Sequence, residues 1–255
     1  MDRGIPSRCV PYAGAVTSDD NGVVQVNWLG EPRHDAEQVP TLVLLHGYGS
    51  NEHDLVSALP IVGALLPDIS AKVLAVRGFF DIPGRPGRYS WFPGQVWVQP
   101  GQPGIAATAD RLAGLVAEHT DSAVWLGFSQ GMCAAIAVLR RRPRLFRGLV
   151  GLSGFSFDAE QHADNWLADE VSAGRGVPAF YGRDPADPAI PDYASAWALG
   201  FLREHTRLEE RTYPRMGHSL SMEEISDVVQ FLRPLLRSDT AGRARAVGFG
   251  RERPQ

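Results

Sequence analysis

The sequence predicts an α/β protein built on a mainly parallel β-sheet with helices on both faces. Two observations lead to this fold class. Short runs of strand length alternate with segments of helical periodicity from about Thr41 to Leu236, which is the pattern of βαβ units. Some strand runs, such as Thr41–Leu45, are almost continuously apolar, as expected for parallel strands covered on both faces. We therefore expect a single domain over residues 1–237, with 1–20 as a loosely held lead-in and 238–255 as a disordered tail.

The N-terminal half is expected to contain three strands and two helical segments. Apolar residues have helical spacing over 54–66, and Pro60 is expected to divide this segment. Residues 77–103 are rich in Gly, Pro and aromatic residues, so they are predicted to form a long ordered loop at the sheet edge. The expected strands are Val23–Leu29, Thr41–Leu45 and 72–76, and the second helix is 104–120.

In the C-terminal half, strands and helices alternate regularly. The run 123–127 is predicted to be a buried strand, and the helix that follows covers 132–142, where Pro143 ends it. Residues 155–175 are expected to combine a loop and a helix. The remaining predicted strands are 147–152, 177–181 and 208–213, and the remaining helices are Asp192–His205 and 222–236.

Composition and charge argue against several classes of protein. Of the 255 residues, 44% are hydrophobic and 21% are charged, as in ordinary globular proteins. The net charge of −4 does not favour nucleic-acid binding, and the arginines after residue 237 are better explained as a solvated tail. Cys9 and Cys133 form neither a disulfide framework nor a zinc pattern. No stretch resembles a signal peptide or is long enough to span a bilayer, so we expect a cytoplasmic protein. The oligomeric state is not predicted.

A serine motif lies where a predicted buried strand meets a helix. Gly127-Phe128-Ser129-Gln130-Gly131 has the G-x-S-x-G pattern of a nucleophile elbow. A serine at such a sharp turn needs unusual backbone angles, and small residues on either side let the strand and the helix approach closely. The turn lifts the serine oxygen above the sheet edge. Ser129 is therefore predicted to be a nucleophile.

A serine hydroxyl needs a base at neutral pH, and the base needs an orienting carboxylate. In open α/β sheets the ligand crevice lies at the carboxyl ends of the strands. His218 follows one predicted strand, and both Asp184 and Asp187 follow the strand before it. The chain order Ser, Asp, His is that of an α/β-hydrolase. We predict His218 as the base and favour Asp187 over Asp184 as the acid, because residues 187–191 match a loop that turns an acid toward the histidine.

Negative charge that develops on a substrate carbonyl oxygen needs preset hydrogen-bond donors. One donor is usually the backbone N–H of the residue after the nucleophile, and another lies in a loop after an earlier strand. These positions are Gln130 and, within His46-Gly47-Tyr48-Gly49, Tyr48. The sequence thus predicts an oxyanion hole made by the backbone N–H groups of Tyr48 and Gln130.

Several segments together resemble the phospholipase/carboxylesterase family of α/β-hydrolases, which also contains the acyl-protein thioesterases. In chain order they are LLHGYGSNEHDL, GFSQGM, LSGF, DPAIP and MGHSLSMEEISDVVQFL. The resemblance covers roughly Pro40 to Leu236. It implies an α/β-hydrolase fold, a triad of Ser129, Asp187 and His218, the same two backbone donors, and no cofactor.

The resemblance also implies a substrate site and shows two departures. Trp91-Phe92 resembles the family's Trp-aromatic element beside the acyl pocket, and Phe155 of LSGF is likewise expected to contact substrate. Met132 stands where the family commonly has a second glycine. The aspartate loop is longer than usual, which keeps Asp184 as an alternative acid.

The predicted function is a serine carboxylic-ester hydrolase that acts through an acyl-enzyme on small esters with short to medium acyl or aromatic groups. A thioesterase or acyltransferase with the same triad is the alternative, and a non-catalytic ligand-binding scaffold is a more remote one. A metal-dependent hydrolase is disfavoured, because His46 and His53 are not spaced as a ligand pair and the sequence has no H-E-x-x-H motif.

Overall fold

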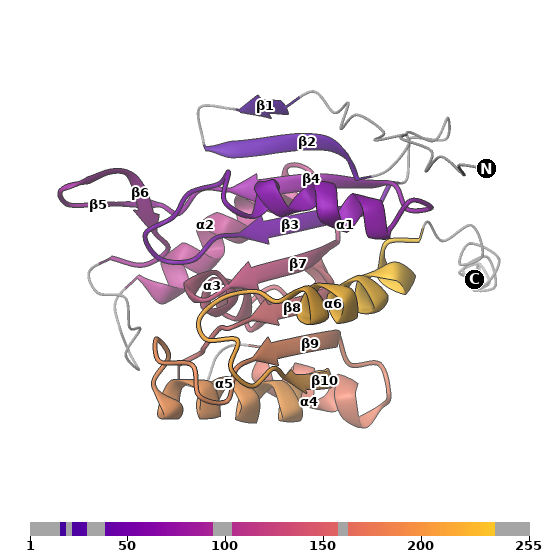
Figure 1. Ribbon diagram of the computed structural model, residues 1–255. Helices are drawn as coiled ribbons and strands as arrows, with labels where there is room; N and C mark the ends of the chain where they lie inside the picture. Colours follow the sequence, from indigo (N-terminus) through magenta and orange to yellow (C-terminus); the bar gives the residue numbers. More distant parts are fainter. Residues whose placement is uncertain (1–15, 19–21, 30–38, 94–103, 158–162, 238–255) are drawn as a thin grey trace, which may run out of the picture.

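An eight-stranded sheet forms the centre of the computed structural model, which describes residues 16–18, 22–29, 39–93, 104–157 and 163–237. The strand order is β1-β2-β4-β3-β7-β8-β9-β10 (Figure 1). The strands are β1 Val16–Ser18, β2 Val23–Leu29, β3 Thr41–Leu45, β4 Ala71–Val76, β7 Ala123–Phe128, β8 Phe146–Leu152, β9 Pro178–Arg183 and β10 Arg207–Thr212.

The strands from β4 across to β10 are parallel, and β1 and β2 extend the sheet in antiparallel fashion at one edge. β3 lies between β4 and β7, with Leu45 opposite Gly127. Parallel strands end at the same edge of a sheet, so the loops after β3, β7, β9 and β10 all emerge there. The mainly parallel sheet confirms the predicted fold class.

Helices cover both faces of this sheet. Leu42 and Leu44 of β3 point into an apolar cluster with α1 and α6, whereas Val43 and Leu45 point into the cluster formed with α2, α3 and α5. Figure 1 shows α1 and α6 in front of the sheet, with α2 and α3 behind it. The α-helices are α1 Leu59–Leu65, α2 Ile105–Ala117, α3 Gln130–Leu139, α4 Asp164–Ser172, α5 Asp192–His205 and α6 Met222–Leu235, and short 3-10 helices cover Leu55–Ala58 and Pro143–Leu145.

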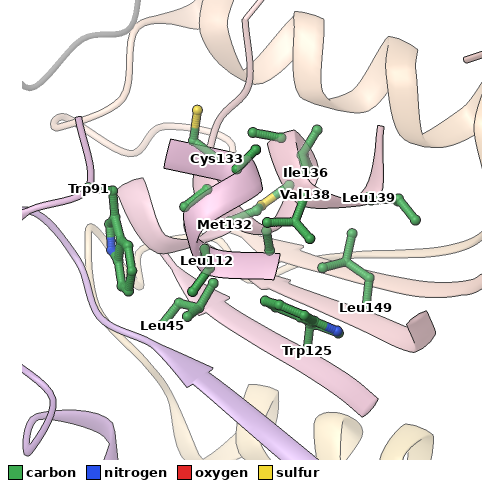
Figure 2. Close-up of a cluster of buried hydrophobic side chains, with 14 of the residues drawn as sticks. Leu45, Trp91, Leu112, Trp125, Met132, Cys133, Ile136, Val138, Leu139 and Leu149 are labelled. Carbon is green, nitrogen blue, oxygen red and sulfur yellow. The ribbon is translucent and has the colours of Figure 1, made fainter. Parts of the chain in front are cut away.

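The helix that follows the serine motif, α3, is buried along its whole length. Figure 2 shows its side chains packed between Leu45, Leu112 and Trp125. Met132 fills the space over two glycines: a Cβ on Gly151 or Gly154 would lie 2.3 or 2.4 Å from its sulfur. Small residues beside it therefore accommodate Met132, at the position where the resemblance led us to expect glycine. The helix α3 is closely packed beneath the turn at Ser129.

Most predicted elements are present with small shifts at their ends. β2, β3 and α5 have the predicted bounds. The segment 54–66 is divided as expected, into the 3-10 helix Leu55–Ala58 and α1. Pro60 lies in the first turn of α1, where its missing N–H costs no hydrogen bond.

One expectation about an irregular segment needs correction. The predicted loop 77–103 contains a hairpin of β5 Phe80–Ile82 and β6 Arg85–Ser90. Gly84 has a φ of 74°, so a glycine that suggested a loop by composition instead makes the turn of this hairpin. Of the predicted lead-in 1–20, the structure describes residues 16–18, which form β1 and pair with β2. Residues 94–103 and the predicted tail 238–255 lie outside the described residues.

Candidate active site

Ser129 occupies a strained turn between β7 and α3. Its backbone has φ 54° and ψ −121°, a conformation that residues other than glycine rarely adopt. The Ser129 N–H donates to the carbonyl of Leu152 on β8 at 2.9 Å, which holds the turn against the neighbouring strand.

The two glycines of the motif are required by close approach. A Cβ on Gly127 would lie 2.4 Å from the nitrogen of Met132, and one on Gly131 would lie 2.1 Å from the carbonyl oxygen of Leu45. Both contacts are with backbone, which cannot swing away as a side chain can. The G-x-S-x-G pattern therefore follows from how tightly α3 is packed against β7 and β3.

His218 lies between Ser129 and Asp187. Its Nε2 is 3.0 Å from the Ser129 hydroxyl oxygen, and its Nδ1 is 2.7 Å from Asp187 Oδ2. An ionised carboxylate only accepts hydrogen bonds, so Nδ1 carries the proton and Nε2 is free to accept from the serine hydroxyl. The structure thus brings the three predicted residues together in the order hydroxyl, imidazole, carboxylate.

Asp184 lies in the same loop but does not reach the imidazole. Its Oδ2 accepts the N–H of Gly217 at 2.7 Å, and its Oδ1 accepts the N–H of Ala186 at 2.9 Å. These N–H groups hold the pKa of the Asp184 carboxyl below its usual value. The alternative acid thus links its own loop to the loop that carries His218.

The loop of His218 is shaped by unusual backbone and by packing. Arg215 and Gly217 have φ values of 71° and 68°. The ring of Phe128 packs on the His218 ring at a centroid distance of 5.0 Å, and the Ser153 hydroxyl donates to the carbonyl of Ser219 at 3.3 Å. These contacts hold the imidazole over the elbow.

The loop after β3 lies directly beside the elbow. A Cβ on Gly47 would be 3.4 Å from the Cβ of Ser129, so the chain passes close to the hydroxyl at this point. The next turn pairs with the hairpin: the Gly49 N–H donates to Tyr89 O and the Tyr89 N–H donates to Ser50 O, both at 2.9 Å. Tyr48 and Gln130, the two predicted backbone donors, therefore flank Ser129 from different elements.

The three residues expected to contact substrate are buried. Trp91, Phe92 and Phe155 are 0%, 0% and 1% exposed and belong to the apolar cluster around α3. In this conformation they pack inside the protein, and contact with substrate stays a prediction. Two buried partners of Trp91 were not predicted: the carbonyl of His46, which accepts the indole N–H, and the hydroxyl of Thr108, which donates to the Trp91 carbonyl. His46 directly precedes the Gly47-Tyr48 turn.

Within the described ranges of the chain, no group of three or more His, Cys, Asp and Glu side chains could hold a metal ion. None of the helices in those ranges has the length and apolarity needed to cross a membrane. Cys133 is fully buried, and burial raises the pKa of its thiol, which disfavours the reactive thiolate.

Comparison with known proteins places this geometry in context. The family model described as Phospholipase/Carboxylesterase matches residues 31–236. Acyl-protein thioesterase 1 of Kluyveromyces lactis is 28% identical over 58% of this chain and 69% of its own length. Acyl-protein thioesterase 1 of Debaryomyces hansenii is 23% identical over 93% of this chain and 100% of its own length. Among solved structures, a carboxylesterase from Mesorhizobium loti has a TM-score of 0.61 at 19% identity, covering 86% of this chain and 98% of that one.

Proposed function

Because the chain belongs to the phospholipase/carboxylesterase family, and so is a serine hydrolase of the esterase type, we propose that it cleaves carboxylic esters with Ser129, His218 and Asp187. The observation that carries this proposal is the position of His218, hydrogen-bonded to Ser129 on one side and to Asp187 on the other. Half-buried side chains lie near these residues: Phe128 directly precedes Ser129, Met216 lies two residues before His218, and Tyr48 follows Gly47, where a Cβ would be 3.4 Å from the Cβ of Ser129. They favour a substrate with a short to medium apolar acyl or aromatic group.

The reaction follows from the roles of these atoms. Ser129 Oγ attacks the ester carbonyl while His218 Nε2 takes its proton, and Asp187 stabilises the imidazolium that forms. The negative oxygen of the tetrahedral intermediate accepts hydrogen bonds from the N–H groups of Tyr48 and Gln130. His218 then gives its proton to the leaving alkoxide, and the acyl group stays on Ser129. Water repeats the sequence, with His218 as base, and releases the acid.

Thioester cleavage is the second candidate, favoured by the relatives named acyl-protein thioesterase 1. The same residues would perform it, because the acyl-enzyme is identical once the leaving group has departed. Acyl transfer differs only in that an alcohol, instead of water, attacks the acyl-enzyme. The substrate that acylates Ser129 fastest therefore distinguishes ester hydrolysis from thioester hydrolysis. Competition between an added alcohol and water distinguishes acyl transfer from both.

The test is a matched set of substrates applied to two serine variants. Wild type, Ser129→Ala and the control Ser172→Ala, at the exposed C-terminal end of α4, are assayed with p-nitrophenyl esters and alkyl thioesters from acetyl to dodecanoyl. We expect Ser129→Ala to lose at least about a thousandfold in kcat and Ser172→Ala to match wild type. Equal activity in Ser129→Ala and wild type would contradict the proposal. A kcat/KM that is consistently higher for thioesters would assign the second function.

A further inference from the structure

Trp91 is hydrogen-bonded to both segments that would form the proposed oxyanion hole, the start of α3 and the loop after β3. Its backbone N–H donates to Oε1 of Gln130 at 3.0 Å. Its indole N–H donates to the carbonyl oxygen of His46 at 2.7 Å. Gln130 is itself one of the two proposed donors, and His46 directly precedes the turn that carries the other, Tyr48. One residue therefore spans two segments that are far apart in sequence.

The bond to Gln130 has a defined direction. A backbone N–H can only donate, so the side-chain atom that faces Trp91 must be the amide oxygen. Gln130 is the first residue of α3 and is fully buried. Its side chain thus ties the first turn of α3 to the segment of Trp91.

The bond to His46 lies in an equally fixed setting. His46 Nε2 accepts the N–H of Gly78 at 2.9 Å, so its proton is on Nδ1, which lies 2.7 Å from the carbonyl of Gly47. Burial lowers the pKa of His46 and keeps its ring neutral. The indole of Trp91 also packs on this ring at a centroid distance of 5.1 Å. The start of the Tyr48 turn is therefore held by both rings.

Trp91 itself cannot move without breaking further contacts. Its carbonyl accepts the hydroxyl of Thr108 on α2 at 3.0 Å, and its side chain has no exposed surface. Figure 2 shows the indole beside Leu45 and Leu112, at one end of the apolar cluster around α3. Such packing restrains the ring to one position, which is what a fixed spacer between two donors requires.

We propose that Trp91 is a positioning residue that sets the separation of the Tyr48 and Gln130 N–H groups before substrate binds. The proposal rests on the proposed function, since it assigns a role in stabilising the oxyanion. Trp91 acts through Gln130 and His46 and does not touch the reacting atoms. Preset donors cost no reorganisation in the transition state, whereas donors that drift apart must be brought back at each turnover. Loss of Trp91 should therefore lower kcat and leave KM nearly unchanged.

Trp125 provides a matched control for the test. It is also fully buried, its indole N–H donates to the carbonyl of Leu145 at 3.1 Å, and it belongs to the same apolar cluster. In Figure 2 it lies at the other end of that cluster, beside Leu149. Trp91→Phe and Trp125→Phe thus remove the same atoms and the same kind of hydrogen bond. Of the two tryptophans, however, only Trp91 is hydrogen-bonded to His46 and Gln130.

The experiment compares kcat, KM and the affinity for an alkyl boronic acid, which forms a tetrahedral adduct on serine, in wild type and both variants. We expect Trp91→Phe to lower kcat and boronic-acid affinity by about tenfold or more, with KM within about twofold. Trp125→Phe is expected to lose a similar amount of thermal stability with kcat near that of wild type. Equal kcat losses in the two variants, or a loss confined to KM, would overturn the proposal.

A second variant approaches the same link from its other end. Gln130→Leu removes the acceptor of the Trp91 backbone N–H and keeps the Gln130 backbone donor, so it is expected to reduce kcat in the same way. Combined with Trp91→Phe it should add little to the loss of kcat. Each change breaks a different hydrogen bond of the same connection from His46 through Trp91 to Gln130, so either one interrupts it. Wild-type kcat in Gln130→Leu, or fully multiplicative losses, would overturn the inference. A wild type that neither hydrolyses esters or thioesters nor reacts with a fluorophosphonate would instead overturn the proposed function, and this inference with it.

Discussion

Asp184 and Asp187 lie in one loop after β9 and both accept backbone N–H groups, but only Asp187 reaches the histidine. Asp187 Oδ1 accepts from the N–H of Ala189 at 2.8 Å, which leaves Oδ2 directed at His218. Asp184 uses both oxygens on backbone groups, one of them in the His218 loop. Neighbouring residues of the same type therefore have separate tasks: one orients the imidazole, and the other fastens the loop that carries it.

Replacing each aspartate by asparagine separates these tasks. Asp187→Asn should lower kcat by about four orders of magnitude, because an amide favours the wrong imidazole tautomer. Asp184→Asn should lower kcat by roughly tenfold, because an amide oxygen can accept from one of the two N–H groups while its NH2 group opposes the other. Steady-state kinetics on a chromogenic ester measures both. Comparable, mild effects of the two substitutions would show that Asp187 is not the acid.

The residues that the sequence could identify are those whose role depends on local pattern or chain order. Ser129 was predicted from its flanking glycines, and His218 from its place after a strand and after the serine. Chain order could not decide between Asp184 and Asp187, because both follow the same strand. The bonds of Trp91 to Gln130 and His46 join segments distant in the chain, so a single sequence carries no signal for them.

The junction between β7 and α3 shows why element packing dictates residue type. Glycine is needed at Gly131 because the carbonyl of Leu45, on the neighbouring strand, occupies the space of a side chain. The same residue type is dispensable where a helix surface is open: a Cβ on Gly200 in α5 would meet no atom within 4 Å. A glycine is therefore required only where the packing of neighbouring elements leaves no room for a Cβ.

Gly131→Ala and Gly200→Ala test this contrast with one chemical change. Gly131→Ala should lower the free energy of unfolding by about 3 kcal/mol, because the added methyl group overlaps fixed backbone, and it should reduce activity by displacing the elbow. Gly200→Ala should raise it by about 0.5 kcal/mol by favouring helical backbone. Denaturant unfolding of both variants measures these changes. Wild-type stability in Gly131→Ala would disprove the close packing of α3 on β3.

Elements with strong periodicity were predictable, and elements defined by distant pairing were not. β3 is apolar from Leu42 to Leu45 because both its faces are covered, so its bounds could be predicted from the sequence. The hairpin β5–β6 was missed because β6 is rich in Gly, Pro and Arg and is mostly exposed. Its stabilising contacts include the backbone pairing of Tyr89 with Ser50. That pairing lies outside any local window of sequence.

At the scale of the whole molecule, the parallel sheet gathers residues from distant parts of the chain at one edge. Another consequence of the same packing is a buried acid, Glu224 on α6. It is 1% exposed, and neither carboxylate oxygen has a hydrogen-bond partner among the described residues. Its Oε1 fits over Gly182 of β9, where a Cβ would lie 2.2 Å away. Burial raises the pKa of Glu224 to about 7.

This buried acid predicts a pH-dependent stability. Between the ordinary glutamate pKa of 4.5 and about 7, the folded protein keeps a proton that the unfolded chain loses, so stability falls as pH rises through this window. Wild type should therefore lose roughly 2 kcal/mol more than Glu224→Gln between pH 5 and pH 8. Denaturant unfolding of both proteins at the two pH values measures the difference. Parallel pH profiles would show that the acid is not held protonated.

Covalent labelling shows whether Ser129 is the nucleophile. Folded wild-type protein is incubated with an alkyl fluorophosphonate, and the modified residue is located by peptide mass spectrometry. We expect a single phosphonyl adduct on Ser129, and no adduct in Ser129→Ala, because among the described residues only this hydroxyl lies within hydrogen-bond distance of His218 Nε2. If folded wild-type protein stays unmodified, or if Ser129→Ala is labelled to the same extent as wild type, Ser129 is not the nucleophile.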